Sequence, residues 1–385
     1  MKIAFDAKHA FQNRTGLGNY SRYILEILCS YYPQHRYITY APHDSDEERM
    51  RAMFRRFSFL TPSFPKGGLS VWWRVWSIKK DIRRAEIDVF HGLTGQLPLT
   101  INDTDAASVV TIHDLIFLRF PHYYNWIDRH IYAYKMRKAC EIATKVIAIS
   151  ECTKRDIIHF FNICPEKIEV VYQGCDAVFS EDGDTTLDAQ VRSRYQLPKD
   201  YVLSVGSIEE RKNTRLLVRA LPQLPQELEL VLVGKRTPYT DAIENEAKQL
   251  NVAHRLHILS GVSFQDLPSI YRGASIFAYP SRYEGFGIPI LEAQRSGLPV
   301  VAATGSCLEE TGGDGALYVH PDDVDGVVHA LLSIYTDETL RSTLIGKGRE
   351  HARKFSEENQ AHQLMEVYQK ALSKKRNKHT QDNDR

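Results

Sequence analysis

Two glutamates eight residues apart, Glu284 and Glu292, flank a glycine-containing turn in the run Ser281-Arg-Tyr-Glu-Gly-Phe-Gly-Ile-Pro-Ile-Leu-Glu. The apolar run Ser275–Tyr279 before it predicts a strand. Pro289, which suits the first helical position, and Gly297, which suits the position after the last turn, predict a helix after it. We therefore expect Glu284 on the loop and Glu292 in the helix. Free amides at a helix start bind anions, and carboxylates beside them can accept hydrogen bonds from hydroxyls. This pattern predicts a phosphate flanked by polyols, as in a sugar nucleotide.

Two adjacent cations, Arg211 and Lys212, lie where another predicted strand turns into a helix, in Ser204-Val-Gly-Ser-Ile-Glu-Glu-Arg-Lys-Asn. A pyrophosphate leaving group gains negative charge as its bond to the sugar breaks. Without a metal ion, fixed guanidinium and ammonium groups are the stabilisers that remain. Taken alone, the pair is better explained as a solvated pair at a helix start, and only the neighbouring motifs favour the functional interpretation.

Two weaker signals lie in the first half of the chain. His113, followed by Asp114, ends a strand and can contact a substrate hydroxyl or merely cap a loop. Gly16 and Gly18, in Thr15-Gly-Leu-Gly-Asn-Tyr20, open a helix and would let the backbone approach a phosphate. This loop does not match GxGxxG, so a plain turn is the alternative.

The sequence offers no convincing metal site, and we expect no metal or other cofactor. Asp-x-Asp pairs can hold a divalent ion, but those of this chain lie in polar loops or the tail, away from strand ends. They occur at 44–46, 103–105, 182–184 and 382–384. The six cysteines are widely separated and form no CxxC pair, which predicts reduced thiols in a cytoplasmic enzyme.

Short β-branched runs alternate with amphipathic stretches along the whole chain, which predicts parallel sheets covered by helices on both faces. Two successive sets of strands predict two Rossmann-like, doubly wound α/β domains facing a central cleft. We expect an N-terminal domain over 1–180, a second domain over 195–355, a helix over 356–373 and a disordered tail over 374–385.

The bulk composition excludes several classes of protein. With 385 residues and a net charge of +1, the chain has no global field that would attract nucleic acid. We find no secretory signal and no apolar run of about 18 residues. The segment 49–84 is locally basic and holds Trp72, Trp73 and Trp76. It predicts either peripheral contact with an anionic membrane surface or simple packing of an aromatic helix.

The combined motifs resemble the retaining glycosyltransferases of family 4, which have the two-domain GT-B fold. The resemblance spans about residues 2–372. It depends on the runs already quoted and on Asp88-Val-Phe-His, Thr111-Ile-His-Asp-Leu, Ala148-Ile-Ser-Glu-Cys-Thr and Val171-Tyr-Gln-Gly-Cys-Asp. Each run is unspecific by itself, whereas their order along the chain is specific.

The resemblance implies a role for each matching residue. Glu284 would bind hydroxyls of the donor sugar, Glu292 the nucleotide ribose, and His113 the transferred sugar near its reacting centre. Arg211 and Lys212 would neutralise the diphosphate. Backbone groups of Gly16 and Gly18, and the amides of Gly285, Phe286, Gly287 and Ile288 in the turn, would help to bind the diphosphate. The backbone of Val262 would contact the base. The first domain would bind the acceptor, the last helix would cross back to it, and the reaction would retain anomeric configuration without a metal.

Two details concern the donor and the departures from the family pattern. The Ile-Glu-x-Arg-Lys-Asn form resembles bacterial mannosyltransferases of polysaccharide biosynthesis, which favours GDP-mannose as donor and a glycan or lipid-linked glycan as acceptor. A UDP-sugar donor is the alternative. Many relatives have Gly-Arg where this chain has Gly206-Ser207, and Cys307-Leu-Glu-Glu replaces a commoner small-Pro-Glu turn.

Other functions fit the sequence less well. A nucleotide-sugar epimerase would share the two-sheet architecture but needs a second pair of acid/base carboxylates, which we cannot place. A non-enzymatic nucleotide-sugar-binding module would not need leaving-group cations. An NAD dehydrogenase is disfavoured because neither half carries the dinucleotide glycine fingerprint.

Overall fold

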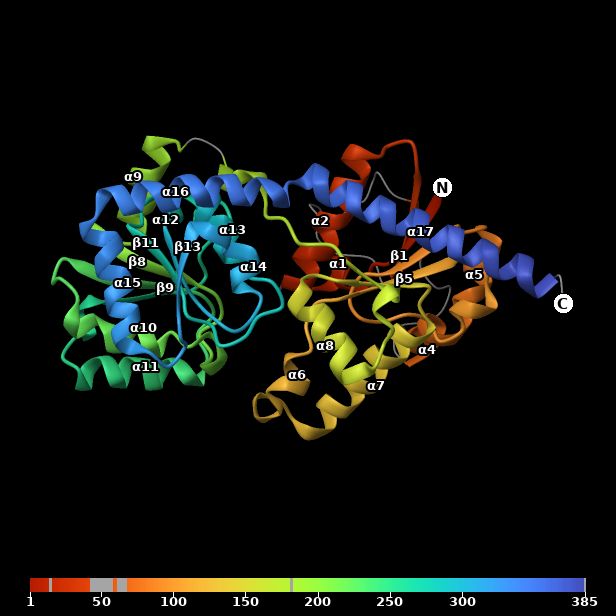
Figure 1. The fold of residues 1–385 in the computed structure, drawn as a ribbon, viewed down its shortest axis with the longest axis horizontal. Helices are drawn as coiled ribbons and strands as arrows, with labels where there is room; N and C mark the ends of the chain where they lie inside the picture. Colours follow the sequence, from red (N-terminus) through yellow and green to blue (C-terminus); the bar gives the residue numbers. More distant parts are fainter. Residues whose placement is uncertain (14–15, 42–57, 61–67, 181–182, 384–385) are drawn as a thin grey trace. The chain divides into compact units, whose positions relative to one another are not determined.

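The computed structural model describes residues 1–13, 16–41, 58–60, 68–180 and 183–383. They form two compact units: the first unit is Met1–Tyr172 with Glu357–Arg385, and the second unit is Gln173–Ser356 (Figure 1). Thr15, the Asp-x-Asp pair at 44–46, and residues 49–57 and 61–67 of the basic aromatic segment lie outside the described residues, as do Asp182 and Asp384.

The first unit is built on a parallel sheet in the order β3-β2-β1-β4-β5-β6-β7. β4, β5 and β6 are buried along their whole length, as expected for strands covered on both faces. The strands are β1 (Lys2–Asp6), β2 (Arg36–Tyr40), β3 (Ser58–Leu60), β4 (Val89–Gly92), β5 (Ala107–Ile112), β6 (Lys145–Ala148) and β7 (Ile168–Val170).

Helices cover both faces of this sheet because alternate strand residues point to opposite sides. Ile3 packs with residues of α2 and α17 in one apolar cluster, whereas Ala4 belongs to a second cluster with residues of α5, α7 and α8. The α-helices of this unit are α1 (Lys8–Gln12), α2 (Gly16–Tyr31), α4 (Gly68–Trp72), α5 (Lys79–Arg84), α6 (Ile116–Arg119), α7 (Trp126–Ile142), α8 (Glu151–Phe161) and α17 (Glu357–Asn383). Short turns are η1, a π-helical turn (Trp73–Ser77), η2 (Ile101–Asp103), η3 (Pro121–Tyr123) and η4 (Pro165–Lys167).

Helix α17 follows the second unit in the chain but belongs to the first unit, as predicted for the crossover helix. Its Tyr368 hydroxyl lies 2.8 Å from Nδ1 of His91, whose Nε2 lies 2.8 Å from Thr111 Oγ1. This buried chain of polar groups joins α17 to β4 and β5.

Helix α17 runs to Asn383, beyond the end at 373 that we predicted, so the tail is helical where we expected disorder. The stretch from 374 contains no glycine or proline and has three lysines and two arginines, which are good helix formers. Lys375 also donates a 3.0 Å hydrogen bond from Nζ to the Thr104 carbonyl. A charged, apolar-poor composition therefore did not exclude a helix.

The second unit holds a parallel sheet in the order β10-β9-β8-β11-β12-β13. Its strands are β8 (Asp200–Val205), β9 (Leu228–Val233), β10 (Leu256–Leu259), β11 (Ile276–Tyr279), β12 (Val300–Ala303) and β13 (Ala316–Val319). Its α-helices are α9 (Thr185–Arg194), α10 (Arg215–Ala220), α11 (Pro238–Gln249), α12 (Leu267–Arg272), α13 (Ile288–Arg295), α14 (Leu308–Gly312), α15 (Val324–Thr336) and α16 (Glu338–Ala352). Its short turns are η5 (Ala177–Ser180), η6 (Glu210–Lys212), η7 (Leu221–Gln223), η8 (Ala253–Arg255), η9 (Gly313–Gly315) and η10 (Arg353–Phe355).

The boundary between the units falls after Tyr172, earlier than the residue 180 that we expected. The reason is local packing: the Phe179 ring lies 5.4 Å from that of Tyr271 in α12, so η5 belongs to the second unit. The predicted α/β architecture of two doubly wound parallel sheets is confirmed. In the part of the chain that the structure describes, no helix is long and apolar enough to span a membrane.

Each sheet has one point where the strand order reverses direction: between β1 and β4 in the first unit, and between β8 and β11 in the second. Loops that leave neighbouring strands at such a point diverge to opposite faces of the sheet. The crevice at the carboxyl ends of those strands is where open α/β sheets bind ligands.

Candidate active site

The two predicted cations lie at the switch point of the second unit. Arg211 and Lys212 form the short turn η6 after β8. Asn213 ends this turn in a left-handed conformation, with φ 56°, and its side-chain amide donates to the carbonyls of Pro280 (3.1 Å) and Pro321 (2.7 Å). The loop after β8 is thereby fixed to the loop after β11.

Glu284 lies between the two cations. Its Oε2 is 2.9 Å from Arg211 Nη1, and its Oε1 is 2.6 Å from Lys212 Nζ. The Lys212 ammonium also donates to the Tyr279 hydroxyl at 2.7 Å, and the Ser281 hydroxyl donates to Glu284. The glutamate is only 8% exposed, so a carboxylate and two cations share a nearly water-free site.

The charges of this group reinforce one another. Burial by itself would raise the pKa of Glu284, but the charges of Lys212 and Arg211 outweigh it and lower the pKa to about 2. Burial would also lower the pKa of the Arg211 guanidinium, which Glu284 and Glu209 instead raise. Glu284 is therefore ionised throughout the neutral range, when it can only accept hydrogen bonds.

The turn from Gly285 to Ile288 opens helix α13, as predicted, and α13 begins at Ile288. Gly287 has φ 106°, and a Cβ atom there would approach Leu308 to 2.8 Å, so the turn requires glycine. The Phe286 ring is buried and packs 5.5 Å from the ring of Phe355, which leaves only its backbone for a ligand.

A buried cysteine, Cys307, holds this turn in place through hydrogen bonds. The Cys307 thiol is fully buried and donates to the carbonyls of Glu284 (3.1 Å) and Phe286 (3.0 Å), while the Thr311 hydroxyl donates to Phe286 at 2.6 Å. The departure from the family pattern at 307 therefore has a structural role, which sequence reasoning left open.

Glu292 lies in α13 and accepts a 2.7 Å hydrogen bond from the Tyr271 hydroxyl. Unlike Glu284, it forms no ion pair with any described residue. Burial raises its pKa to about 7; the hydrogen bond from Tyr271 opposes this effect, and the charge of Asp176 adds to it. The two glutamates of the motif thus have opposite electrostatic environments.

Val262 is half-buried in the loop after β10, at the same carboxyl edge of the sheet but two strands away from β8. The structure therefore places four predicted features of the second unit along one edge, namely the cation pair, Glu284, the turn and Val262, and it places Glu292 in the helix that follows the turn. It brings Arg211, Lys212 and Glu284 into direct contact. Sequence reasoning missed Tyr279, Ser281 and Tyr271, although Tyr279 ends the predicted strand and Ser281 begins the quoted run.

The remaining predicted residues belong to the first unit. His113 directly follows β5, donates from Nε2 to the Leu93 carbonyl at 2.9 Å and packs edge-on against Tyr20 at 4.5 Å. Burial lowers its pKa to about 4, so it is a neutral imidazole. Gly16 opens α2 with free space around its α-carbon, whereas a Cβ at Gly18 would lie 1.8 Å from the Asn13 carbonyl oxygen. Close backbone packing therefore explains Gly18 without a ligand.

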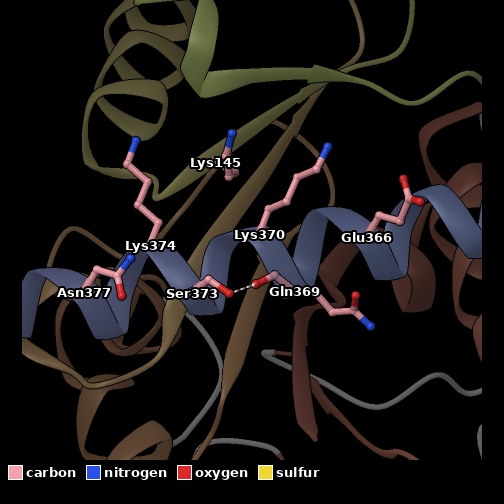
Figure 2. Close-up of a pocket in the computed structure, with 7 residues that line it drawn as sticks. All are labelled: Lys145, Glu366, Gln369, Lys370, Ser373, Lys374 and Asn377. Atoms are coloured by element: carbon pink, nitrogen blue, oxygen red, sulfur yellow. Dashed lines mark hydrogen bonds between the residues drawn. The ribbon is translucent and has the colours of Figure 1, made fainter.

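A hollow along α17 is not a second active site. Figure 2 shows Lys145, Lys370 and Lys374 around it, with Glu366, Gln369, Ser373 and Asn377. Lys145 starts β6, so the hollow lies at the amino ends of the strands, opposite the edge where such sheets bind ligands. Glu169 forms ion pairs with Lys145 (2.6 Å) and Lys370 (3.0 Å), which neutralises part of the charge.

Two Rossmann-like units, one with a buried cation–carboxylate site at its switch point, form an architecture that suits a nucleotide-activated substrate. Comparisons with known proteins identify the family. The model described as Glycosyltransferase Family 4 matches residues 20–179, and the model described as Glycosyl transferases group 1 matches residues 189–351. The O-antigen chain mannosyltransferase B of Escherichia coli is 31% identical over 286 residues, which cover 73% of this chain and 74% of that protein.

Other relatives and solved structures agree. The serotype-specific mannosyltransferase WbdA of Escherichia coli is 28% identical over 297 residues, or 74% of this chain and 36% of that protein. Sucrose-phosphate synthase from Thermosynechococcus elongatus superposes with a TM-score of 0.77 at 21% identity, covering 97% of this chain and 99% of that one. Anabaena Alr3699/HepE in complex with UDP-glucose gives 0.74 at 19% identity, covering 95% and 99%. The chain belongs to glycosyltransferase family 4 and has the GT-B fold, and the prediction that it is a glycosyltransferase is confirmed.

Proposed function

We propose that the protein is a retaining hexosyltransferase that moves mannose from GDP-mannose to a glycan or lipid-linked glycan acceptor in cell-surface polysaccharide biosynthesis. The observation that carries this proposal is the buried group of Arg211, Lys212 and Glu284 at the switch point of the second sheet. Similarity to proteins named as mannosyltransferases supports the sugar. A UDP-sugar donor is the alternative, because a neighbour in fold is a complex with UDP-glucose.

In this proposal Arg211 and Lys212 bind the donor diphosphate, together with the amides from Gly285 to Ile288 at the start of α13. Glu284 is ionised and accepts hydrogen bonds from sugar hydroxyls, and Glu292 binds the ribose. The two cations are held in place before the donor arrives, since both already contact Glu284. Such preorganised charges stabilise the diphosphate as it departs.

The reaction that follows needs no protein nucleophile. The bond between the anomeric carbon and the diphosphate oxygen breaks, and the acceptor oxygen bonds to the same face of that carbon. The acceptor proton moves to an oxygen of the departing diphosphate, which leaves as GDP. His113, a neutral residue of the first unit, contacts the transferred sugar. The backbone of Gly16 and Gly18 contacts the phosphate, and the backbone of Val262 contacts the base. We propose that this chemistry is metal-independent, and activity that persists in EDTA would support that point.

Sugar-nucleotide turnover by Lys212→Ala and Glu284→Ala tests the proposal. We expect both variants to lose nearly all transfer, with at least about 100-fold lower kcat/KM, because each removes a charged contact in a buried site. Lys248→Ala, an exposed lysine on α11, is the matched control and should retain wild-type activity. Circular dichroism should show that all three variants are folded. Full activity in both site variants would exclude the proposed site.

A thermal-shift panel of GDP- and UDP-sugars identifies the donor, because a ligand that binds only the folded state raises its melting temperature. We expect the largest shift with GDP-mannose. A larger shift with a UDP-sugar would replace the proposed donor by the alternative. Incubating the preferred donor alone and finding an epimer by NMR would instead indicate an epimerase. We place the enzyme in the cytoplasm, with peripheral contact at the inner face of the membrane as part of the proposal.

A further inference from the structure

The switch point of the first sheet carries a group of cations that the proposed donor chemistry does not use. Asp6 ends β1 beside Gly92, the last residue of β4. Arg74 Nε lies 3.0 Å from Asp6 Oδ2, with side-chain exposures of 13% and 7%, and the same guanidinium donates to Gln96 Oε1. This buried pair joins η1 to the carboxyl ends of β1 and β4, where a ligand of such a sheet would lie.

Two lysines, Lys8 and Lys135, form no ion pair with any acid in the part of the chain that the structure describes. Lys8 follows Asp6 by two residues and is half-buried, and its ammonium forms no ion pair with any described residue. The Lys8 backbone amide donates to Asp6 Oδ1 at 3.3 Å, so Lys8 and Arg74 both adjoin Asp6. Burial and the charge of Arg74 lower the pKa of Lys8, the charge of Asp6 opposes them, and the charge of Lys135 lowers it further. Lys135 is exposed on α7, and its neighbour Met136 lies against Gly95 in the loop after β4.

Counted over the described residues, the local charge balance is positive. Asp6 is paired with Arg74, the charges of Lys8 and Lys135 remain, and burial lowers the pKa of the nearby His9, which favours its neutral form. A half-buried cation without a counter-ion costs free energy that a bound anion would recover. Two lysines and a forked guanidinium suit the oxygens of a phosphate or diphosphate.

The elements that carry these cations also expose apolar side chains. Of the eleven large hydrophobic residues that are exposed in the described chain, eight lie on α4, η1 and α7. They include Trp72 (53% exposed) and Trp76 (48%) beside Arg74, and Trp126 (66%) and Ile131 (44%) on the helix of Lys135. Figure 1 shows α4 and α7 on the same lower side of the first unit. Single exposed apolar residues are ordinary, but such a concentration indicates an apolar ligand or surface.

Phosphate-binding cations flanked by exposed aromatic helices match the chemistry of a phosphorylated lipid, with an anionic head and a hydrocarbon chain. We propose that Lys8, Arg74 and Lys135 bind the phosphate of a lipid-linked acceptor, whose hydrocarbon chain lies along the exposed face of α7. The inference depends on the proposed transferase function for its role in catalysis, and it assigns acceptor residues that the donor site does not include.

Binding of decyl phosphate to the full-length protein tests the site directly. The titration, by calorimetry, is done with saturating GDP so that the donor's phosphate site is occupied. We expect Lys8→Ala and Lys135→Ala each to weaken binding about 10-fold, as for loss of a charged hydrogen bond, whereas Lys374→Ala on α17 should bind like the wild type. Unchanged affinity in both site variants, or loss of decyl phosphate binding when GDP is added, would overturn the proposal.

Inorganic phosphate and a second pair of variants separate the head from the chain. Trp126→Ser and Ile131→Ser should weaken decyl phosphate binding while leaving the weaker binding of inorganic phosphate unchanged. Equal affinity of the wild type for the two probes would refute the lipid part of the proposal. The experiment needs no turnover, so it remains informative if the enzyme transfers no sugar, which would refute the proposed function instead. With an active enzyme, Lys8→Ala should raise the KM for acceptor and not that for donor.

Discussion

Replacing Glu292 by glutamine should stabilise the protein, and the gain should grow as the pH rises. Burial raises the pKa of this carboxyl group to about 7 from an ordinary value of 4.5. The folded state therefore binds a proton that the unfolded state has lost between these two pH values. Ionisation of the wild-type residue in the folded state costs free energy above pH 7, and a neutral glutamine avoids that cost.

The magnitude follows from the two pKa values. A glutamate whose folded-state pKa is raised contributes most favourably below its unfolded pKa, and that contribution is lost as the pH rises through the folded value. At high pH the loss reaches about 3 kcal/mol, since one pKa unit corresponds to about 1.4 kcal/mol. Between about pH 5.5 and 8.5 the difference between the glutamine variant and the wild type should widen by about 2 kcal/mol.

Thermal unfolding of both proteins across this pH range measures the effect. For a unit of this size, the difference in melting temperature should widen by about 4–8 °C from the acidic to the basic end. The hydrogen bond between Tyr271 and the new amide adds an offset that does not change with pH, so the slope is the diagnostic quantity. A difference in melting temperature that stays constant over the whole range would refute the reasoning.

Glu284→Gln is the control, because the same substitution in the other glutamate should have the opposite sign. The pKa of Glu284 is lowered to about 2, so its ion pairs stabilise the folded state above the ordinary pKa and are lost only as the pH falls toward 2. We expect this variant to be less stable than the wild type from about pH 5.5 to 8.5, by an amount that hardly varies.

Substitutions at three further positions test the residues that support the site and the fold. Gly287→Ala should lower stability by about 1–3 kcal/mol and raise the KM for donor, because φ 106° strains any other residue; wild-type values for both would contradict this. Cys307→Val should raise the donor KM severalfold while Cys307→Ser, which retains a donor, should not; equal KM values would exclude a positioning role. Tyr368→Phe should lower the free energy of urea unfolding by about 1–3 kcal/mol because it leaves buried His91 with an unpaired nitrogen, and a change near zero would show that the bond is unimportant.

Much of the fold was predictable because the central strands are short runs of mainly apolar, often β-branched residues. β5 and β11, for example, are buried along their entire length, so tertiary packing and local preference agree. The end of α17 was not predictable from composition, since the same lysine-rich segment suits either a solvated helix or a disordered tail. What distinguishes them is a distant contact, from Lys375 to the Thr104 carbonyl, which no local pattern reveals.

In the candidate site, too, some features were predictable from the sequence and others were not. The positions of Arg211, Lys212 and Glu284 after their strands followed from the sequence, because parallel strands end at one edge. Their mutual contacts did not follow, because 72 residues separate Lys212 from Glu284. Direct ion pairing results from β8 and β11 being neighbours across the switch point, and strand order is a property of the whole sheet.

The order of the strands also explains why the two glutamates of one motif differ chemically. Glu284 lies in the loop after β11 and forms ion pairs with Arg211 and Lys212 in the loop after β8. It is therefore charged at every physiological pH and can only accept hydrogen bonds. Glu292 lies in α13 beside Tyr271, where burial without a cation raises its pKa to about 7 and lets it donate or accept near neutrality. Two carboxyl groups whose environments separate their pKa values serve different partners. A permanently charged Glu284 suits a role at sugar hydroxyls beside the diphosphate, and of the two glutamates only Glu292 should make donor affinity change with pH near neutrality.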